Sequence, residues 1–478
     1  MAEMNKSRRY FLRTSAVLAA GFTLPRCGSG TAAVDHSFSN IAVLGELIKA
    51  KKVSPVAITK ACLERIERFN PRLNAFITVT AESALAEAAI ADKEIREGKW
   101  RGPLHGIPVS YKDNIDTAGV KTTAASAVFK DRIPAEDAAV VKKLKAAGAI
   151  CVGKTNMHEF ALGTTSLISF YGPVHNPWNT DYIAGGSSGG SAVAVAAGMC
   201  YASIATDTGG SSRLPPACCG ITGFKASHGL VSMNGVIPVS ASYDHVCPIC
   251  RSAEDAAILL SAMNEQGKDY RNSFTTNKTF TIGIPKEYKA SAEAEDIFRK
   301  AIAVFIAMGC RTTVVELPAE GTGPDVFQYE LESYHQPLIK KFKEKYNPVT
   351  LADIQNEMKG ITAEAYTAEK IKMENERKNI SGILFNGCDV LMLPVTSTAT
   401  PTIAAAIKDG PFALEGINTE PFNGFGLPAM SIPCGFDKNG MPLGLQIVGP
   451  RWREDLVLDA ADKYQQATNW HLKHPSIS

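Results

Sequence analysis

The sequence lacks an excess of charge of either sign. Lysine and arginine together number 50, aspartate and glutamate 48, and the formal net charge is +2. Proteins that bind nucleic acid usually present a basic field to the phosphate backbone, and this composition gives no reason to expect a nucleic-acid partner. With 478 residues, 45% of them hydrophobic, the chain has enough material for a large globular core.

A long apolar run is also missing. The most apolar stretch near the N-terminus, residues 14–24, is too short to span a membrane. It follows the pair Arg8–Arg9 and precedes small residues, an order typical of an export signal. The arginine pair with Phe11 and Leu12 resembles a twin-arginine signal, which exports folded proteins.

We therefore expect residues 1–33 to be an export signal cleaved after Ala33, and the mature protein to be periplasmic or secreted. We expect no membrane span beyond the signal. A lipid anchor at Cys27 is the alternative, but Arg26 stands where such a signal needs a small residue.

The eleven cysteines form no disulfide framework. Their number is odd, they are scattered, and a chain of this length does not need cross-links. Cys247 and Cys250 form a single C-x-x-C, and neither a second pair nor histidines follow at zinc-ligand spacing. We expect two buried thiols there, and neither a metal nor a cofactor.

Helical and extended patterns alternate along the chain without repeats or long linkers. Ser54 and Pro55 begin a helical pattern, residues 107–112 form a strand pattern that ends at Lys112, and residues 202–206 form another before a glycine-rich turn. This alternation predicts one large α/β domain over residues 34–478, with a mixed central β-sheet covered by helices on both faces. Its core motifs lie in residues 100–260 and 385–475, and the more polar, helical residues 285–385 are expected to cap one end.

One loop gathers four glycines and three serines into residues 185–191, just before an apolar helical pattern. A phosphate-binding P-loop is excluded, because Ser191 and Ala192 occupy the positions of its lysine and hydroxyl residue. The dinucleotide pattern G-x-G-x-x-G does not match either. Residues 185–189 fit the pattern G-x-S-x-G, but no histidine stands out as a triad partner. The loop is interpreted as backbone shaped for close approach that carries hydroxyl groups.

Three segments in order carry a specific resemblance: "HGIPVSYKDN" (residues 105–114), "GGSSGGSAVAVAAG" (185–198) and "TDTGGSSRLPPACCGITGFK" (206–225). Together they resemble the amidase signature family. The likeness resumes near the C-terminus at "FNGFGLPAMSIPCGFDKNGMPLGLQIVG". The resemblance implies an amidase that hydrolyses a carboxylic amide to an acid and an amine or ammonia, without a metal or cofactor.

The resemblance also implies residue roles. Ser211 falls on the nucleophile, Ser187 on a serine that follows a cis peptide bond, and Lys112 on the base. This fits elementary chemistry, because a serine hydroxyl needs an adjacent base and a lysine can be that base only when it is neutral. The oxyanion hole would be formed by Thr208, Gly209 and Gly210, with support from Ser188, Asp207 and Arg213.

The resemblance implies that the substrate is a small-molecule or peptide amide. Ala125, Phe160, Ala161 and Leu162 are expected to line its channel. Ser212, at a position that is usually aliphatic in the family, is also expected near the channel.

Two other functions remain open. One is the glutaminase subunit of a tRNA-dependent amidotransferase; against it, Leu214 stands where such subunits usually show glutamine. The other is a non-catalytic binding protein on the same scaffold, against which the intact Lys112, Ser187 and Ser211 argue.

Overall fold

The computed structural model describes residues 35–275, 279–318 and 323–477. The expected export signal and Cys27 lie outside this part of the chain. The strands are β1 (Phe76–Val79), β2 (Pro108–Lys112), β3 (Ile150–Thr155), β4 (Ala202–Asp207), β5 (Thr222–Lys225), β6 (His245–Cys250), β7 (Thr281–Pro285), β8 (Arg311–Val315), β9 (Val390–Pro394), β10 (Ala429–Phe436) and β11 (Pro442–Val448). The longer helices are α2 (Ile41–Lys49), α3 (Pro55–Leu73), α4 (Ala81–Arg96), α5 (Ala139–Ala146), α6 (Gly189–Ala196), α8 (Ala253–Met263), α9 (Ala292–Ala307), α10 (Pro324–Phe342), α11 (Pro348–Glu357), α12 (Ala363–Leu384) and α15 (Glu454–Ala467), and the shorter ones are α7 (Leu214–Cys219), α13 (Ile403–Asp409) and α14 (Pro421–Gly424).

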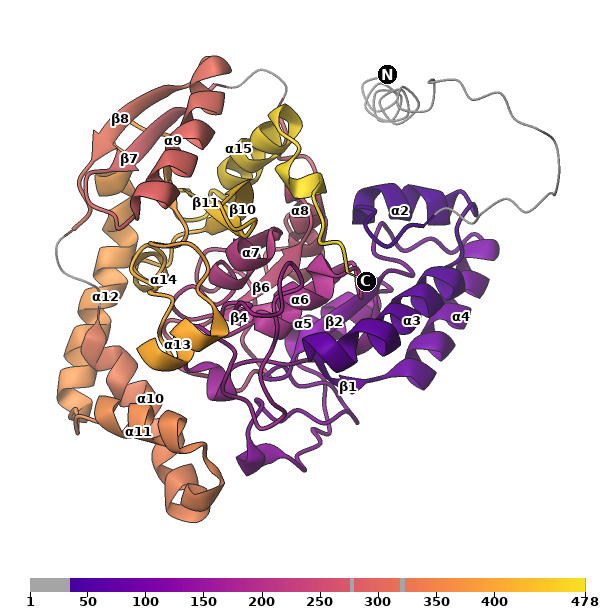
Figure 1. The fold of residues 1–478 in the computed structure, drawn as a ribbon, viewed down its shortest axis with the longest axis horizontal. Coiled ribbons are helices and arrows are strands. Elements are labelled where there is room, and N and C mark those ends of the chain that lie inside the picture. Colours follow the sequence, from indigo (N-terminus) through magenta and orange to yellow (C-terminus); the bar gives the residue numbers. More distant parts are fainter. Residues whose placement is uncertain (1–34, 276–278, 319–322, 478) are drawn as a thin grey trace. The chain divides into compact units, whose positions relative to one another are not determined.

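The strands form one mixed sheet in the order β1-β3-β2-β4-β6-β5-β10-β11-β9-β7-β8. β2 runs parallel to both β3 and β4, the strands from β4 through β6, β5, β10 and β11 to β9 pair antiparallel, and β9, β7 and β8 are parallel again. Figure 1 shows the helices around this sheet. The predicted fold class is confirmed.

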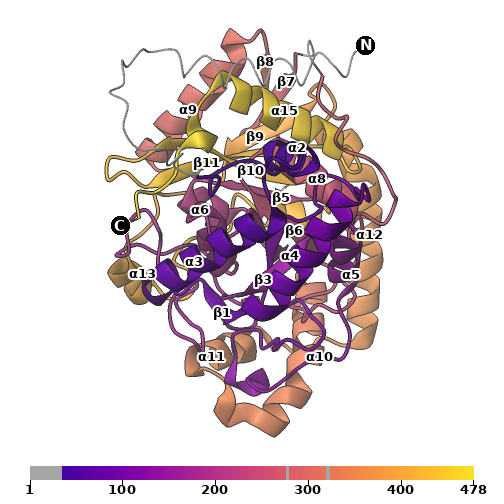
Figure 2. The same ribbon diagram turned by 90° about the vertical axis from the view of Figure 1, so that its right-hand side faces the viewer.

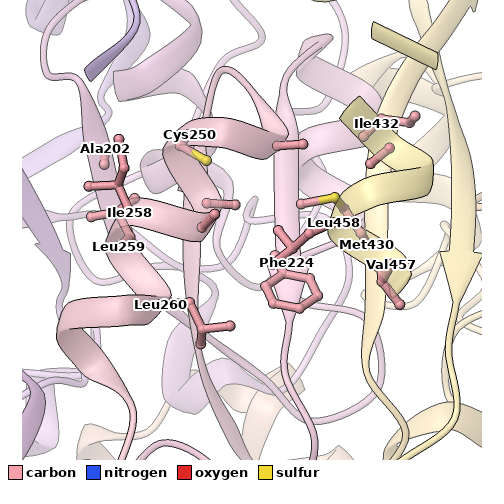
Figure 3. Packing of buried hydrophobic residues seen from close by; sticks show 14 of the residues in the cluster. Ala202, Phe224, Cys250, Ile258, Leu259, Leu260, Met430, Ile432, Val457 and Leu458 are labelled. Carbon is pink, nitrogen blue, oxygen red and sulfur yellow. The ribbon is translucent and has the colours of Figure 1, made fainter. Parts of the chain in front are cut away.

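Helices cover both faces of the sheet. Ile204 belongs to the core on the face of α8, α9 and α15, whereas its neighbour Ala205 belongs to the core on the face of α6 and α7. This opposition follows from the alternation of side chains along a strand. Figure 3 shows the first core, where Phe224 and Met430 from the sheet lie near Leu458 of α15.

Local sequence signals explain where the elements begin. Ser54 accepts a hydrogen bond from the N–H of Val56 and caps α3, with Pro55 at the first helical position, as expected. Figure 2 shows α3 and α4 beside β1 and β3. The patterns do not predict β1, β5, β6 and α2, because these elements are short or are buried without a clear periodicity.

Residues 285–385, expected to cap one end, fall into two parts in the structure. β8 and α9 belong to the central sheet and its core, because β8 pairs with β7 and Phe298 of α9 is buried there. The helices α11 and α12 both pack against α10, and all three are labelled in Figure 1. We call residues 324–384 the lateral helices.

Candidate active site

Lys112 ends β2, and Thr206 lies near the end of the neighbouring parallel strand β4. Parallel neighbours bring their carboxyl ends to the same edge of a sheet, so these two side chains meet. Lys112 Nζ donates to Thr206 Oγ1 over 3.0 Å and to Ser187 Oγ over 2.7 Å. Its side chain is fully buried, and burial lowers its pKa to about 7, against the attraction of Asp207 and Asp244.

Asp113, the next residue, does not pair with Lys112. Its carboxylate accepts hydrogen bonds from the N–H and hydroxyl of Thr123 and lies 3.8 Å from Lys154 Nζ. The adjacent acid therefore faces a different lysine, as the change of side along an extended chain predicts. The hydrogen-bond partners of Lys112 are hydroxyl groups, which carry no charge. Burial is therefore the main influence on the pKa of Lys112.

The loop before α6 places Ser187 beside Lys112. The peptide bond between Gly186 and Ser187 is cis, in agreement with the resemblance. The Ser187 carbonyl accepts from the N–H of His158, and Ser188 Oγ donates to the Thr206 carbonyl over 3.2 Å. A Cβ on Gly186 would lie 2.6 Å from the backbone of Thr165, so the glycine is needed for close approach of the two segments.

Ser211 lies in the turn between β4 and α7 and is 8% exposed, whereas Ser187 is fully buried. In the described part of the chain, no hydrogen bond joins the two hydroxyl groups. Ser211 is therefore the more accessible of the two hydroxyl groups, and Ser187 is the one that contacts the lysine.

The carboxylate of Asp207 organises this turn. It accepts from the N–H of Gly210, from the N–H and Oγ of Ser212, and from Arg213 Nε and Nη2 at 3.0 and 2.9 Å. Burial alone would raise its pKa, but the Arg213 guanidinium and these donors hold it well below its usual range. Ser212 is therefore part of this buried network, and its expected place near the substrate channel stays a prediction.

Sequence analysis missed the residues that complete the network. Arg213 Nη1 donates to the Thr419 carbonyl and to Gln446 Oε1 over 2.8 and 2.7 Å. Asn423 Nδ2 donates to Asp207 Oδ1 over 2.8 Å. The signal available was the C-terminal stretch of the resemblance, which contains Asn423 and Gln446, but nothing in the sequence alone places it on the turn.

The predicted oxyanion donors are not equivalent. The N–H of Gly210 is already hydrogen-bonded to Asp207 over 2.8 Å, which differs from the expectation that it would serve an oxyanion. Thr208 donates its hydroxyl to Asp244 over 2.6 Å. Thr208 and Gly209 are half-buried at the edge of the turn. In the described residues no hydrogen bond occupies the backbone N–H groups of Thr208, Gly209 or Ser211, so these three stay candidate donors.

The comparisons with known proteins point to one family. The family model described as Amidase matches residues 57–458. The chain belongs to the amidase family. The chain is 37% identical to the A subunit of glutamyl-tRNA(Gln) amidotransferase from Methylococcus capsulatus, over 91% of its own length and 98% of that protein.

Solved structures are also similar to the chain. A crystal structure of an amidase superposes with a TM-score of 0.80 and 31% identity, covering 89% of this chain and 99% of that one. The native peptide amidase from Stenotrophomonas maltophilia superposes with a TM-score of 0.77 and 28% identity, covering 91% and 98%. The chain is therefore an amidase-signature hydrolase.

The residues expected to line the substrate channel differ in their surroundings. Phe160 is closely packed, stacked on Tyr346 and edge-on to Phe129 and His335, so it forms part of a core beneath the lateral helices. Ala125 is also fully buried. Ala161 and Leu162 belong to the same core and are each 8% exposed, so they keep some contact with solvent.

His158, Cys247 and Cys250 are all buried in the described part of the chain. Burial and the nearby Lys112 lower the pKa of His158 to about 3, which keeps its ring neutral. Cys247 and Cys250 are buried free thiols on β6. Within the described ranges, no cluster of histidine, cysteine, aspartate or glutamate could hold a metal ion, and no helix is long and apolar enough to cross a membrane.

Proposed function

We propose that this amidase hydrolyses a linear carboxylic amide through an acyl-enzyme on Ser211. Neutral Lys112 takes the proton of Ser187, which takes that of Ser211 as its oxygen attacks the amide carbonyl. The relay returns a proton to the departing amine nitrogen when the C–N bond breaks. Water, activated by the same relay, then hydrolyses the ester to release the acid.

The single observation that carries this proposal is the 2.7 Å hydrogen bond between buried Lys112 Nζ and Ser187 Oγ. A buried lysine without a carboxylate partner has a low enough pKa to accept a proton near neutral pH. The N–H groups of Gly209 and Ser211 would stabilise the negative oxygen, each contributing on the order of 3 kcal/mol.

A serine-reactive fluorophosphonate tests this function. We expect intact-mass measurement to show one adduct on the wild-type protein and on the exposed-site control Ser83→Ala, and none on Ser211→Ala or Lys112→Ala. Amide hydrolysis should fall on the order of 10⁴-fold or more in Ser211→Ala while the circular dichroism spectrum is kept. Full activity in that variant would contradict the mechanism.

The similarity to the glutamyl-tRNA(Gln) amidotransferase protein favours a second candidate, an amidotransferase component that acts with partner proteins. Leu214, fully packed at the start of α7, argues against it, because such proteins usually show glutamine at this position. Glutamine hydrolysis that appears only with a co-purified partner would favour this second function. Hydrolysis of simple amides by the isolated chain would favour the first.

We further propose that the chain is exported, with residues 1–33 as a twin-arginine signal. The support is the order of the arginine pair, the apolar stretch and the small residues in the sequence. The amide substrate would then be met in the periplasm or outside the cell.

A further inference from the structure

A chain of hydrogen bonds begins at Thr208, the residue before Gly209. Thr208 Oγ1 donates to Asp244 Oδ1 over 2.6 Å. The other oxygen of Asp244 accepts from the N–H groups of Val239 and Ser240 over 2.9 and 3.2 Å. Asp244 is buried and both its oxygens are used, so its orientation is fixed by the 239–244 turn. The position of the Thr208 side chain therefore depends on the 239–244 turn, through Asp244.

Glu330, on α10 of the lateral helices, holds the same turn. Its Oε2 accepts from Ser240 Oγ and from the N–H of Ser242 over 2.6 and 2.9 Å, and its Oε1 accepts from Ser242 Oγ over 2.7 Å. Tyr366 and Lys370 of α12 donate to Oε1 over 3.0 and 3.3 Å. The Glu330 side chain is 11% exposed. One carboxylate thus joins two lateral helices, labelled in Figure 1, to the 239–244 turn.

We propose that Glu330 is a positioning residue for the reaction, acting through the 239–244 turn and Asp244 on Thr208 and the adjacent donor Gly209. The inference rests on the proposed amidase function. Oxyanion donors act by being fixed where charge develops, and a displacement of about 1 Å can cost on the order of a hundredfold in rate. A residue that fixes the donor loop from a distance therefore affects kcat more than substrate binding.

The first test compares Glu330→Gln with Glu332→Gln. Both remove one carboxylate charge from α10, but Glu332 accepts from the N–H of Gly360, inside the lateral helices. On one reporter amide, Glu330→Gln should lower kcat on the order of tenfold and leave KM within about twofold, while Glu332→Gln stays near wild type. The measured rate is divided by the amount of protein that the fluorophosphonate labels once labelling is complete. A loss of folded protein then does not lower the resulting kcat.

A double-mutant cycle tests the route. Thr208→Val keeps the shape of the side chain and removes the bond to Asp244. If Glu330 acts through Thr208, the double variant Thr208→Val/Glu330→Gln is no slower than Thr208→Val alone. If the double variant lowers kcat by the product of the two single factors, the proposed route through Thr208 is overturned. Should Glu330→Gln fail to fold, Ser240→Ala removes one of its partners on the turn and takes its place in the cycle.

The outcomes separate this inference from the proposed function. If Ser211→Ala keeps wild-type activity, the mechanism falls and the role of Glu330 falls with it. If activity requires Ser211 but Glu330→Gln behaves like Glu332→Gln, only the positioning role is overturned.

Discussion

Lys112 donates a hydrogen bond to Ser187 over 2.7 Å, and its other partner is the hydroxyl of Thr206. A second buried lysine, Lys154, has a different set of partners. Lys154 is equally buried, but it lies 3.8 Å from the carboxylate of Asp113. Of these two lysines, only Lys112 has hydroxyl partners alone, and this lowers the cost of losing its proton.

The pH profile of kcat/KM should rise with a midpoint near 7, because Lys112 must be neutral to act as base and burial lowers its pKa to about 7. The buried Asp244 also has a pKa raised to about 7, so the profile alone does not assign the group. Thr206→Val removes an acceptor that favours charged Lys112 and should shift the midpoint to lower pH. An unchanged midpoint in that variant would assign the profile to another group.

Lys112→Met and Lys154→Met should have opposite consequences. Lys112→Met should abolish amide hydrolysis while the unfolding free energy is kept, because a buried amine without a carboxylate partner contributes little to stability. Lys154→Met leaves Asp113 buried without its cation and should lower the unfolding free energy by about 3–5 kcal/mol. Urea unfolding followed by circular dichroism measures both. Equal destabilisation in the two variants would contradict this distinction.

Gly210→Ala should be far more damaging than Gly209→Ala. Gly210 has φ +137° and a Cβ there would collide with Thr419 Oγ1, so we expect a loss of about 1–3 kcal/mol in stability together with most of the activity. At Gly209 the nearest atom to a Cβ is Glu420 Cγ at 3.7 Å, an ordinary contact. Thermal unfolding should leave Gly209→Ala near wild type. A stable, active Gly210→Ala would mean that the turn can rearrange.

Arg213→Met should destabilise the protein by about 3–5 kcal/mol, because it leaves the buried Asp207 carboxylate without its guanidinium. The control is Arg299→Met, whose ion pair with Glu295 is solvent-exposed on the arginine side and contributes under about 1 kcal/mol. Chemical denaturation of both variants measures the difference. Similar midpoints would show that the Asp207 network tolerates loss of its cation.

Export predicts that the secreted mature chain begins at Val34, after cleavage behind Ala33. Intact-mass measurement of the secreted fraction checks this, and replacing Arg8–Arg9 by lysines should keep the precursor in the cell. A mass with an added lipid at Cys27 would instead support the anchor. A full-length chain found only in the cytoplasm would contradict export.

The sequence by itself determined the fold class and pointed to the three residues proposed to be catalytic. Period-two and helical patterns located β2, β4 and α3, and three ordered motifs supplied Lys112, Ser187 and Ser211. Such signals are local, since each depends on neighbours within one element or one loop.

Only the tertiary structure decided which backbone N–H groups of the 208–211 turn are free to donate to an oxyanion, and which residues hold that turn in place. The N–H of Gly210 is already bonded to Asp207, and Phe160 packs into a core. Asn423 reaches Asp207 across 216 positions of the chain, and Glu330 reaches Ser240 across 90. Hydrogen bonds between residues so far apart leave no periodic pattern, because folding alone brings their partners together.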